Sequence, residues 1–301
     1  MNAGPAVFDR TAIARNLRRA QRLGPATFLI DRVAEDFGDR LSTVLRHFEL
    51  AADIGSPTDA VRQRLRRANT ASRIVALLPP AAALPTRKRE LTAIADPEAL
   101  PLRDNSFDLV FSALALQSVN DLPGTFIQIE RALKPDGLFA AALIGGESLT
   151  ELRQAFAAAE AELEDGASPR VAPFADVRSM GMLLQRAGFA LPVTDLERLT
   201  VRYDSAFCLM HDLRRMGATN ALAQRRRTPL RRGTLLRMTE IYAERFSDAD
   251  GRIRATFDLV WLSGWKAHPN QQRPLRPGSA KARLADALGT REFPAGDKAP
   301  G

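Results

Sequence analysis

The apolar run SFDLVFSALAL at residues 106–116 most constrains how this chain can fold. An unbroken apolar pattern is typical of a strand that is covered on both faces, as in a parallel sheet. Further strands are predicted at residues 48–54, 73–78, 91–96 and 138–145, and helices are predicted between them at residues 59–69 and 123–133. This alternation predicts an α/β fold with a doubly wound, mostly parallel sheet that binds its ligands at the carboxyl ends of its strands.

The segments on either side of this core predict additional elements. Apolar residues at helical spacing predict two N-terminal helices over residues 12–48, separated at Gly24 and Pro25. Later helices are predicted at residues 150–164, 174–190, 206–216 and 233–246, and later strands at residues 191–205 and 252–268. The predicted parts are an N-terminal helical region (1–47), a core (48–147), a part with inserted helices and the last two strands (148–268), and a loosely ordered tail (269–301).

The composition restricts the chemistry and the partners. A single cysteine, Cys208, excludes a disulfide framework and a multi-cysteine metal site, and it fits a reducing compartment. The net charge of +8 favours an acidic protein or a membrane surface as a partner. The alternative is that the arginines form a solvated surface without a partner. Aromatic residues make up only 6% of the chain, so nucleic acid is not an expected partner. No stretch approaches about 18 uncharged apolar residues, so we expect a cytoplasmic protein without a transmembrane segment, with peripheral membrane contact left open.

The turn DIGSPTD at residues 53–59 has the outline of a nucleotide-binding loop in which most glycines are replaced. Asp53 and Gly55 remain, whereas Pro57 removes an amide donor and Asp59 places a carboxylate near the start of the helix. These changes disfavour a phosphate-rich dinucleotide. They penalise S-adenosylmethionine less, because it has no phosphates and its sulfonium is cationic. A plain strand-to-helix turn capped by Asp59 is the competing interpretation.

Two further residues belong to the predicted cofactor site. Asp96 ends the third predicted strand, where its carboxylate could accept a hydrogen bond from an adenine amino group; its alternative role is in a turn or a helix cap. Leu114 follows the fourth predicted strand. Together with Asp53 and Gly55, these residues make up the predicted cofactor-binding set.

Several separated motifs carry a resemblance to known proteins. They are VFDR (7–10), LPLRDNSFDLVFSALALQSVNDLP (100–123), LKPDGLF (133–139), GGESLTELR (145–153), SPRVAPFADV (168–177), LLQRAGF (183–189) and GWKAH (264–268). They resemble the class I methyltransferase superfamily. Within it they are most similar to the branch of the mitochondrial complex I assembly factor that hydroxylates an arginine, and more distantly to the carrier-protein methyltransferase of biotin synthesis. The resemblance implies a seven-stranded, Rossmann-like sheet and S-adenosylmethionine as the cofactor.

The chain departs from this family at the cofactor site. The segment RIVALLPPAAA at residues 73–83 lacks the acidic residue that binds the ribose hydroxyls in this fold, and Glu90 lies too far along the chain to replace it. Ser118 stands where the family places a tryptophan. Each lost contact could cost about 1 to 3 kcal/mol, so binding of S-adenosylmethionine is expected to be weakened or lost.

Methyl transfer chiefly requires alignment of the nucleophile with the methyl group, so it needs no dedicated base. The candidates after the fourth predicted strand are Gln117, Asn120 and Asp121. Their alternative role is hydrogen bonding in the loop and at the helix cap before Pro123.

A second group of candidates lies on or after the last predicted strand. Trp265, Lys266 and His268 combine an aromatic ring, a cation and an imidazole, which could shape a substrate pocket. Core packing of Trp265 and a structural or exposed position of His268 are the alternatives. No metal ligand is assigned, because no set of two histidines and one carboxylate can be chosen from the sequence.

Three hypotheses about function follow. The first is an S-adenosylmethionine-dependent methyltransferase acting on a protein or a small acid. The second is an assembly factor that oxidises a protein arginine, and the third is a pseudoenzyme that keeps the fold as a binding module. We favour a methyltransferase-family protein linked to assembly of respiratory complex I, with a protein substrate that could be a subunit of that complex.

Overall fold

The structure is a computed structural model that describes residues 6–81, 91–164, 166–271, 283–290 and 296. The chain divides into two compact units, Met1–Ala267 and His268–Gly301. Helix α9 (Leu284–Leu288) belongs to the second unit. Much of the tail that is expected to be loosely ordered lies outside the described residues.

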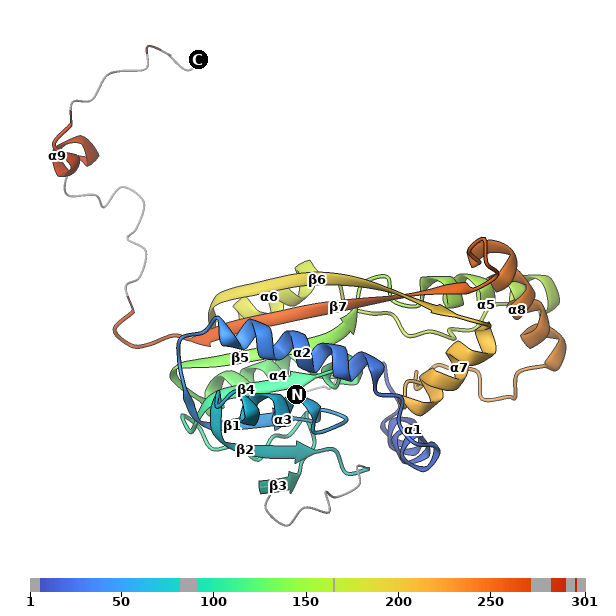
Figure 1. Ribbon diagram of the computed structural model, residues 1–301, viewed down its shortest axis with the longest axis horizontal. Coiled ribbons are helices and arrows are strands. Elements are labelled where there is room, and N and C mark those ends of the chain that lie inside the picture. The colour runs from blue at the N-terminus through green and yellow to red at the C-terminus, as the bar shows by residue number, and fades with distance from the viewer. Residues whose placement is uncertain (1–5, 82–90, 165, 272–282, 291–295, 297–301) are drawn as a thin grey trace. The chain divides into compact units, whose positions relative to one another are not determined.

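A seven-stranded sheet in the order β3-β2-β1-β4-β5-β7-β6 forms the centre of the first unit (Figure 1). Its strands are β1 (Phe48–Ile54), β2 (Ala71–Leu78), β3 (Leu91–Ile94), β4 (Phe107–Ala113), β5 (Leu133–Gly145), β6 (Phe189–Tyr203) and β7 (Ile253–Lys266). The first five pair in parallel, and β7 runs antiparallel to both β5 and β6. The predicted seven-stranded, mostly parallel sheet is confirmed.

Helices cover both faces of this sheet. One buried apolar cluster includes side chains of α2 (Phe28–Ser42), α3 (Ala60–Arg67), α5 (Thr150–Leu163), α7 (Ala206–Arg215) and α8 (Arg232–Phe246). The other includes side chains of α4 (Leu122–Ala132) and α6 (Val177–Ala187). Leu109 and Phe111 of β4 enter the first cluster and Val110 between them enters the second, which is why most of this strand is apolar.

Helix α1 (Arg10–Leu23) packs against α7 near the carboxyl edge of the parallel strands (Figure 1). Asp9 caps it by accepting a hydrogen bond from the Ala12 N–H at 3.0 Å. Before the cap, Phe8 forms an antiparallel bridge with Leu222, and the Asp9 N–H donates to the Ala221 carbonyl at 2.7 Å. We call residues 7–9 the N-terminal strap.

One predicted boundary is corrected. The sequence KPDG at residues 134–137 was expected to be a turn before a strand at residue 138, but β5 begins at Leu133. The pairing with β4 jumps from Leu133 opposite Phe107 to Leu138 opposite Leu109, so the four residues are accommodated as an irregularity within the strand. Asp136 has a φ of +59° there.

None of the helices in the described ranges is both long and apolar enough to cross a membrane.

Candidate functional site

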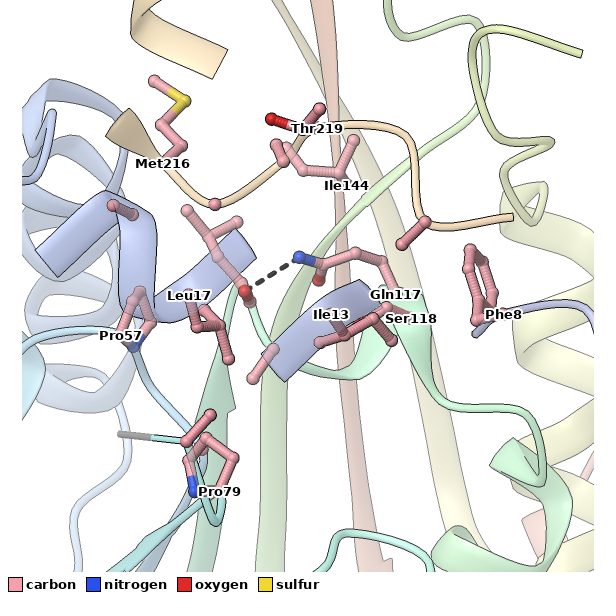
Figure 2. A pocket seen from close by; sticks show the side chains of 18 of the residues that line it. Phe8, Ile13, Leu17, Pro57, Pro79, Gln117, Ser118, Ile144, Met216 and Thr219 are labelled. Carbon is pink, nitrogen blue, oxygen red and sulfur yellow. Dashed lines mark hydrogen bonds between the residues drawn. The ribbon is translucent and has the colours of Figure 1, made fainter. Parts of the chain in front are cut away.

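A cavity of about 1210 Å³ lies at the carboxyl ends of β1, β2 and β4. Figure 2 shows side chains of α1 (Ile13 and Leu17), of the segment after α7 (Met216 and Thr219) and of the segment after β4 (Gln117) around it. Most of its lining is apolar. Its position at the carboxyl edge is the one expected for a ligand site in this kind of sheet.

The turn after β1 forms part of the cavity wall. Gly55 has a φ of +71°, and its N–H donates to the Leu77 carbonyl at 2.8 Å. A Cβ at this position would lie 3.1 Å from the Cβ of Ala115, so glycine is favoured both by its conformation and by the close approach of the segment after β4. Pro57 and Thr58 complete this part of the wall.

Asp53, which is predicted to belong to the cofactor site, lies beneath the wall and outside the lining of the cavity. Its side chain is 1% exposed, and it forms an ion pair with Arg62 of α3, whose side chain is 5% exposed. Asp53 also accepts a hydrogen bond from the Ser56 hydroxyl. The Ser56 Oγ in turn accepts from the Ala113 N–H at 3.1 Å, which ties the turn to the end of β4.

Arg62 lines the cavity and was missed by the sequence analysis. The basic pattern of its helix resembled a solvent-exposed surface, and nothing in the sequence shows that one arginine turns inward. The competing interpretation of the turn is also corrected, because the Asp59 side chain makes no cap hydrogen bond. The Thr58 Oγ1 instead accepts from the Ala60 N–H at 3.3 Å.

The wall at the end of β2 is apolar. Leu77, Leu78, Pro79 and Pro80 line the cavity where the fold family places its ribose-binding acid. The position at which the ribose-binding acid is missing therefore lies on the wall of this cavity.

Asp96 lines the cavity, as expected, but its carboxylate is already engaged. It pairs with Arg10 of α1, and its Oδ1 accepts from the Glu98 N–H at 3.0 Å. The hydrogen bond with Asp96 raises the pKa of Arg10. Arg10 belongs to the VFDR motif, so the structure gives that motif a role at the cavity which the sequence analysis did not assign.

Leu114 and Gln117 lie where they can contact a ligand. Leu114 has a φ of +52°, and its N–H donates to the Ala142 carbonyl at 2.7 Å. The Gln117 Nε2 donates to the Leu114 carbonyl at 2.8 Å, which is the dashed line in Figure 2. The Gln117 Oε1 is buried and accepts no hydrogen bond from any described residue. An unsatisfied buried acceptor at a cavity wall is a candidate for binding a ligand donor.

Asn120 and Asp121 have structural roles instead. The Asn120 Oδ1 accepts from the Phe8 N–H at 2.8 Å, and its Nδ2 donates to the Phe8 carbonyl at 3.2 Å, so it holds the N-terminal strap. Asp121 caps α4 by accepting from the Gly124 N–H at 2.8 Å. These contacts match the alternative that the sequence left open for both residues.

Trp265 and Lys266, which are predicted to shape a substrate pocket, do not line this cavity. Because β7 is antiparallel to β5, its last residues lie beside the first residues of β5, as in the pair Leu138 and Trp265. That edge is opposite the carboxyl edge where the cavity lies. The Lys266 Nζ lies 3.7 Å from Glu130 Oε1 and 3.3 Å from the Arg131 carbonyl oxygen.

His268 belongs to the second compact unit, where its Nδ1 accepts from the Asn270 N–H at 3.1 Å. The residue is half-buried. In the described part of the chain, no three side chains of His, Cys, Asp or Glu come together as a metal-binding group.

The motif SPRVAPFADV contributes directly to the cavity. Arg170 and Phe174 line it, and fully buried Glu160 of α5 fixes Arg170 by accepting from its Nε at 2.7 Å. Glu160 also accepts from the Ser168 N–H at 2.6 Å. A buried carboxylate with these partners fixes the loop that carries the motif.

The motif GGESLTELR has a structural role. The Glu147 N–H donates to Asp258 Oδ2 at 2.8 Å, and Arg198 Nε donates to Asp258 Oδ1 at 2.7 Å. Gly146 has a φ of +55°, and a Cβ there would lie 2.5 Å from Asp258 Oδ2. The glycine is thus required by the close approach of the buried carboxylate.

Comparisons with known proteins agree with this architecture. Residues 52–141 match the family described as "Methyltransferase domain". The chain is 36% identical to the mitochondrial arginine-hydroxylase NDUFAF5 of Danio rerio over 94% of this chain and 90% of that protein. For the Homo sapiens protein of the same name, identity is 37% over 93% of this chain and 83% of that protein.

The chain is also similar to a methyltransferase of known name and to a solved structure. The chain is 32% identical to the malonyl-acyl-carrier-protein O-methyltransferase of Gallionella capsiferriformans over 89% of this chain and 94% of that enzyme. Among solved structures, the YcgJ protein of Bacillus subtilis has a TM-score of 0.50 at 14% identity and covers 78% of this chain and 99% of its own. That structural likeness shows the fold.

Proposed function

This chain belongs to the family of methyltransferase-fold proteins that includes the NDUFAF5 arginine-hydroxylases, and we propose that it binds S-adenosylmethionine and acts on a protein substrate in assembly of respiratory complex I. The observation that carries the proposal is the similarity over most of the length of both proteins. Methyltransferase-class relatives and the matched domain support the cofactor. The assembly role rests on the resemblance to the arginine-hydroxylase branch.

The cavity fits S-adenosylmethionine in part. Gly55 lines the cavity at the turn after β1, and the unsatisfied Gln117 Oε1 can accept a hydrogen bond from an amino or ammonium group. The apolar wall at Leu77 and Leu78 suits an adenine ring. The missing acid after β2 weakens the fit, so we expect binding weaker than in relatives that keep it.

When bound, the cofactor would supply the methyl group, and the protein would align the acceptor with it and exclude water. Gln117 and the backbone of residues 55–58 are the groups that would hold it. Gln117 would act by binding and orienting the ligand.

The first test is calorimetric titration with S-adenosylmethionine and S-adenosylhomocysteine. Gln117→Leu removes the unsatisfied acceptor with little change in side-chain volume, so we expect binding about tenfold weaker, corresponding to one lost hydrogen bond. Gln185→Leu, at an exposed position of α6, is the matched control and should leave the affinity unchanged. Absence of binding by the unchanged protein up to millimolar ligand would reject the cofactor proposal and favour the binding module.

The second candidate reaction is hydroxylation of a protein arginine, which the names of the NDUFAF5 relatives support. Mass spectrometry of complex I subunits from cells with and without this protein distinguishes the two reactions. A protein-dependent methyl group supports methyl transfer, and a protein-dependent oxygen atom supports hydroxylation. Co-purification of an unmodified subunit would support the binding module.

A further inference from the structure

Three arginines border the cavity where it opens to solvent. Arg15 and Arg18 are exposed and lie three residues apart on α1, so they share a face of that helix. Arg214 is exposed near the end of α7, the helix against which α1 packs. We call Arg15, Arg18 and Arg214 the rim arginines.

The rim arginines differ from the other arginines of the cavity in their partners. Arg10, Arg62, Arg170 and Arg215 each form an ion pair with a carboxylate. Within the residues that the structure describes, none of the rim arginines forms one.

The carboxylates that line the cavity do not offset this charge. Asp96 and Glu98 line it, and both contact Arg10, at the side of the cavity next to the segment after β3. The opening of the cavity therefore carries positive charge without a neighbouring ion-pair partner among the described residues.

A fourth arginine, Arg19, is repelled electrostatically by two of the rim arginines. Arg19 is half-buried, and its Nη2 donates to Asn16 Oδ1 at 2.9 Å and to Thr219 Oγ1 at 3.0 Å. Burial lowers the pKa of Arg19, and the charges of Arg214 and Arg15 lower it further. Neighbouring like charges destabilise one another, and an anion bound among them would reduce that cost.

We propose that the rim arginines bind an acidic segment of the protein substrate and guide one of its side chains into the cavity. This inference rests on the proposed function and names the substrate class of the same site. Guanidinium groups bind carboxylates through paired, charge-assisted hydrogen bonds, so carboxylates along a peptide suit several neighbouring arginines. The positive potential would also raise the rate of encounter with an acidic partner.

The shape and lining of the site favour a peptide over other polyanions. At about 1210 Å³ the cavity exceeds the usual range of about 300 to 1,000 Å³ for small-molecule sites, which leaves room for a substrate side chain beside a cofactor. A single-stranded nucleic acid would need exposed aromatic rings for stacking, and the aromatic residues that line this cavity are phenylalanines that are buried or half-buried. A membrane surface would meet a flat or convex basic face, whereas these arginines surround a hollow.

The experiment measures binding of a fluorescein-labelled decapeptide of alternating glutamate and glycine to the full-length protein by fluorescence anisotropy. In the rim variant, Arg15, Arg18 and Arg214 are all replaced by glutamate, and we expect binding at least about tenfold weaker. The control variant replaces Arg22, Arg178 and Arg186 by glutamate, so its net charge equals that of the rim variant. These three arginines are exposed, lie on helices and are outside the cavity lining. The control variant should bind the peptide nearly as well as the unchanged protein.

A third variant with lysine at the three rim positions keeps the charge, and it should retain most of the binding. Circular dichroism of all variants verifies that they fold. Equal losses in the rim and control variants would show a general charge effect and overturn the proposal. Displacement of the peptide by inorganic phosphate at equal concentration would point to a small-anion site and overturn it as well.

The same variants are titrated with S-adenosylmethionine, which separates this inference from the proposed function. Loss of peptide binding with unchanged cofactor affinity supports the rim site. If no variant binds the cofactor but the rim variant alone loses the peptide, the cofactor proposal fails and the docking site stands. If the cofactor binds and the peptide binds none of the proteins, the docking site fails.

Discussion

Arg62 and Asp53 form a buried ion pair directly under the candidate cofactor turn. Removing one member of such a pair leaves the other charge buried without compensation, which typically costs about 3 to 5 kcal/mol. Arg62→Met is therefore expected to lower the free energy of unfolding by about that amount. Urea denaturation followed by circular dichroism measures it.

Two variants accompany this prediction. Arg64→Met removes an exposed arginine from the same helix, whose ion pair with Asp39 is solvent-accessible, and it should cost less than about 1 kcal/mol. The double variant Asp53→Asn/Arg62→Met should recover part of the lost stability, because no charge is left buried. Equal effects of Arg62→Met and Arg64→Met would contradict this account of the pair.

Pro79 is the residue at which a ribose-binding carboxylate can be restored. It directly follows β2 and lines the cavity. Pro79→Glu is expected to strengthen S-adenosylmethionine binding about tenfold to hundredfold, since a hydrogen bond to a charged group contributes about 1.5 to 3 kcal/mol. Calorimetry measures the change, and Pro79→Gln, which lacks the charge, should give a smaller gain. Unchanged affinity in Pro79→Glu would mean that the ligand does not reach the end of β2.

The elements of the sheet show which predictions the sequence could support. The apolar run of β4 and the alternation of strands and helices were sufficient to predict a doubly wound, mostly parallel sheet, because burial on both faces of a strand makes its sequence apolar. The direction of β7 has no such effect on its sequence. Trp265 and Lys266 were therefore expected at the ligand edge, although an antiparallel last strand ends at the opposite edge.

Side-chain partners across elements were equally hidden. Arg10 and Asp96 are far apart in sequence, and the position of α1 near the carboxyl edge of the sheet brings them together. Asp53 and Gly55 were correctly assigned to the turn, but the sequence gave no indication that α3 supplies the partner of Asp53. Gln117 was predicted from its place after β4, and its buried oxygen keeps it a candidate.

The ionised carboxylate of Asp258 on β7 accepts the hydrogen bonds that join β7 to Arg198 of β6 and to Glu147 of the GGESLTELR motif. Burial opposes the ionised form, but the hydrogen bonds from Arg198 and from the Glu147 N–H outweigh it and lower the pKa of Asp258 below its ordinary value of about 3.9. A carboxyl group whose pKa is lowered by folding stabilises the fold above its unfolded-state pKa. It loses that contribution as the pH falls through the folded-state value.

Acid denaturation tests this dependence. As the pH falls from about 5 to below 4, the free energy of unfolding should decrease, and the decrease should be less steep in Asp258→Asn, which is less stable at neutral pH. Other carboxylates contribute to both proteins, so the difference between the two pH profiles is the quantity to compare. Identical slopes would show that Asp258 does not titrate in this range.

At the scale of the whole molecule, the cavity is assembled from distant parts of the chain. The turn after β1, the segment after β4, the SPRVAPF loop, α1 and the segment after α7 all contribute to it. Substitutions of rim residues and of turn residues therefore affect one site, and their effects on ligand binding need not be additive.

The N-terminal strap has a consequence for the timing of maturation. Phe8 and Asp9 are held by residues 221 and 222 as well as by Asn120, so the strap has its full set of partners only after about 210 further residues have been synthesised. At about 5 to 20 residues per second, a ribosome needs roughly ten seconds or more to reach that point. The nascent chain must keep α1 and its exposed arginines undocked for this interval, so a ligand that needs the closed cavity cannot assist the early stages of folding.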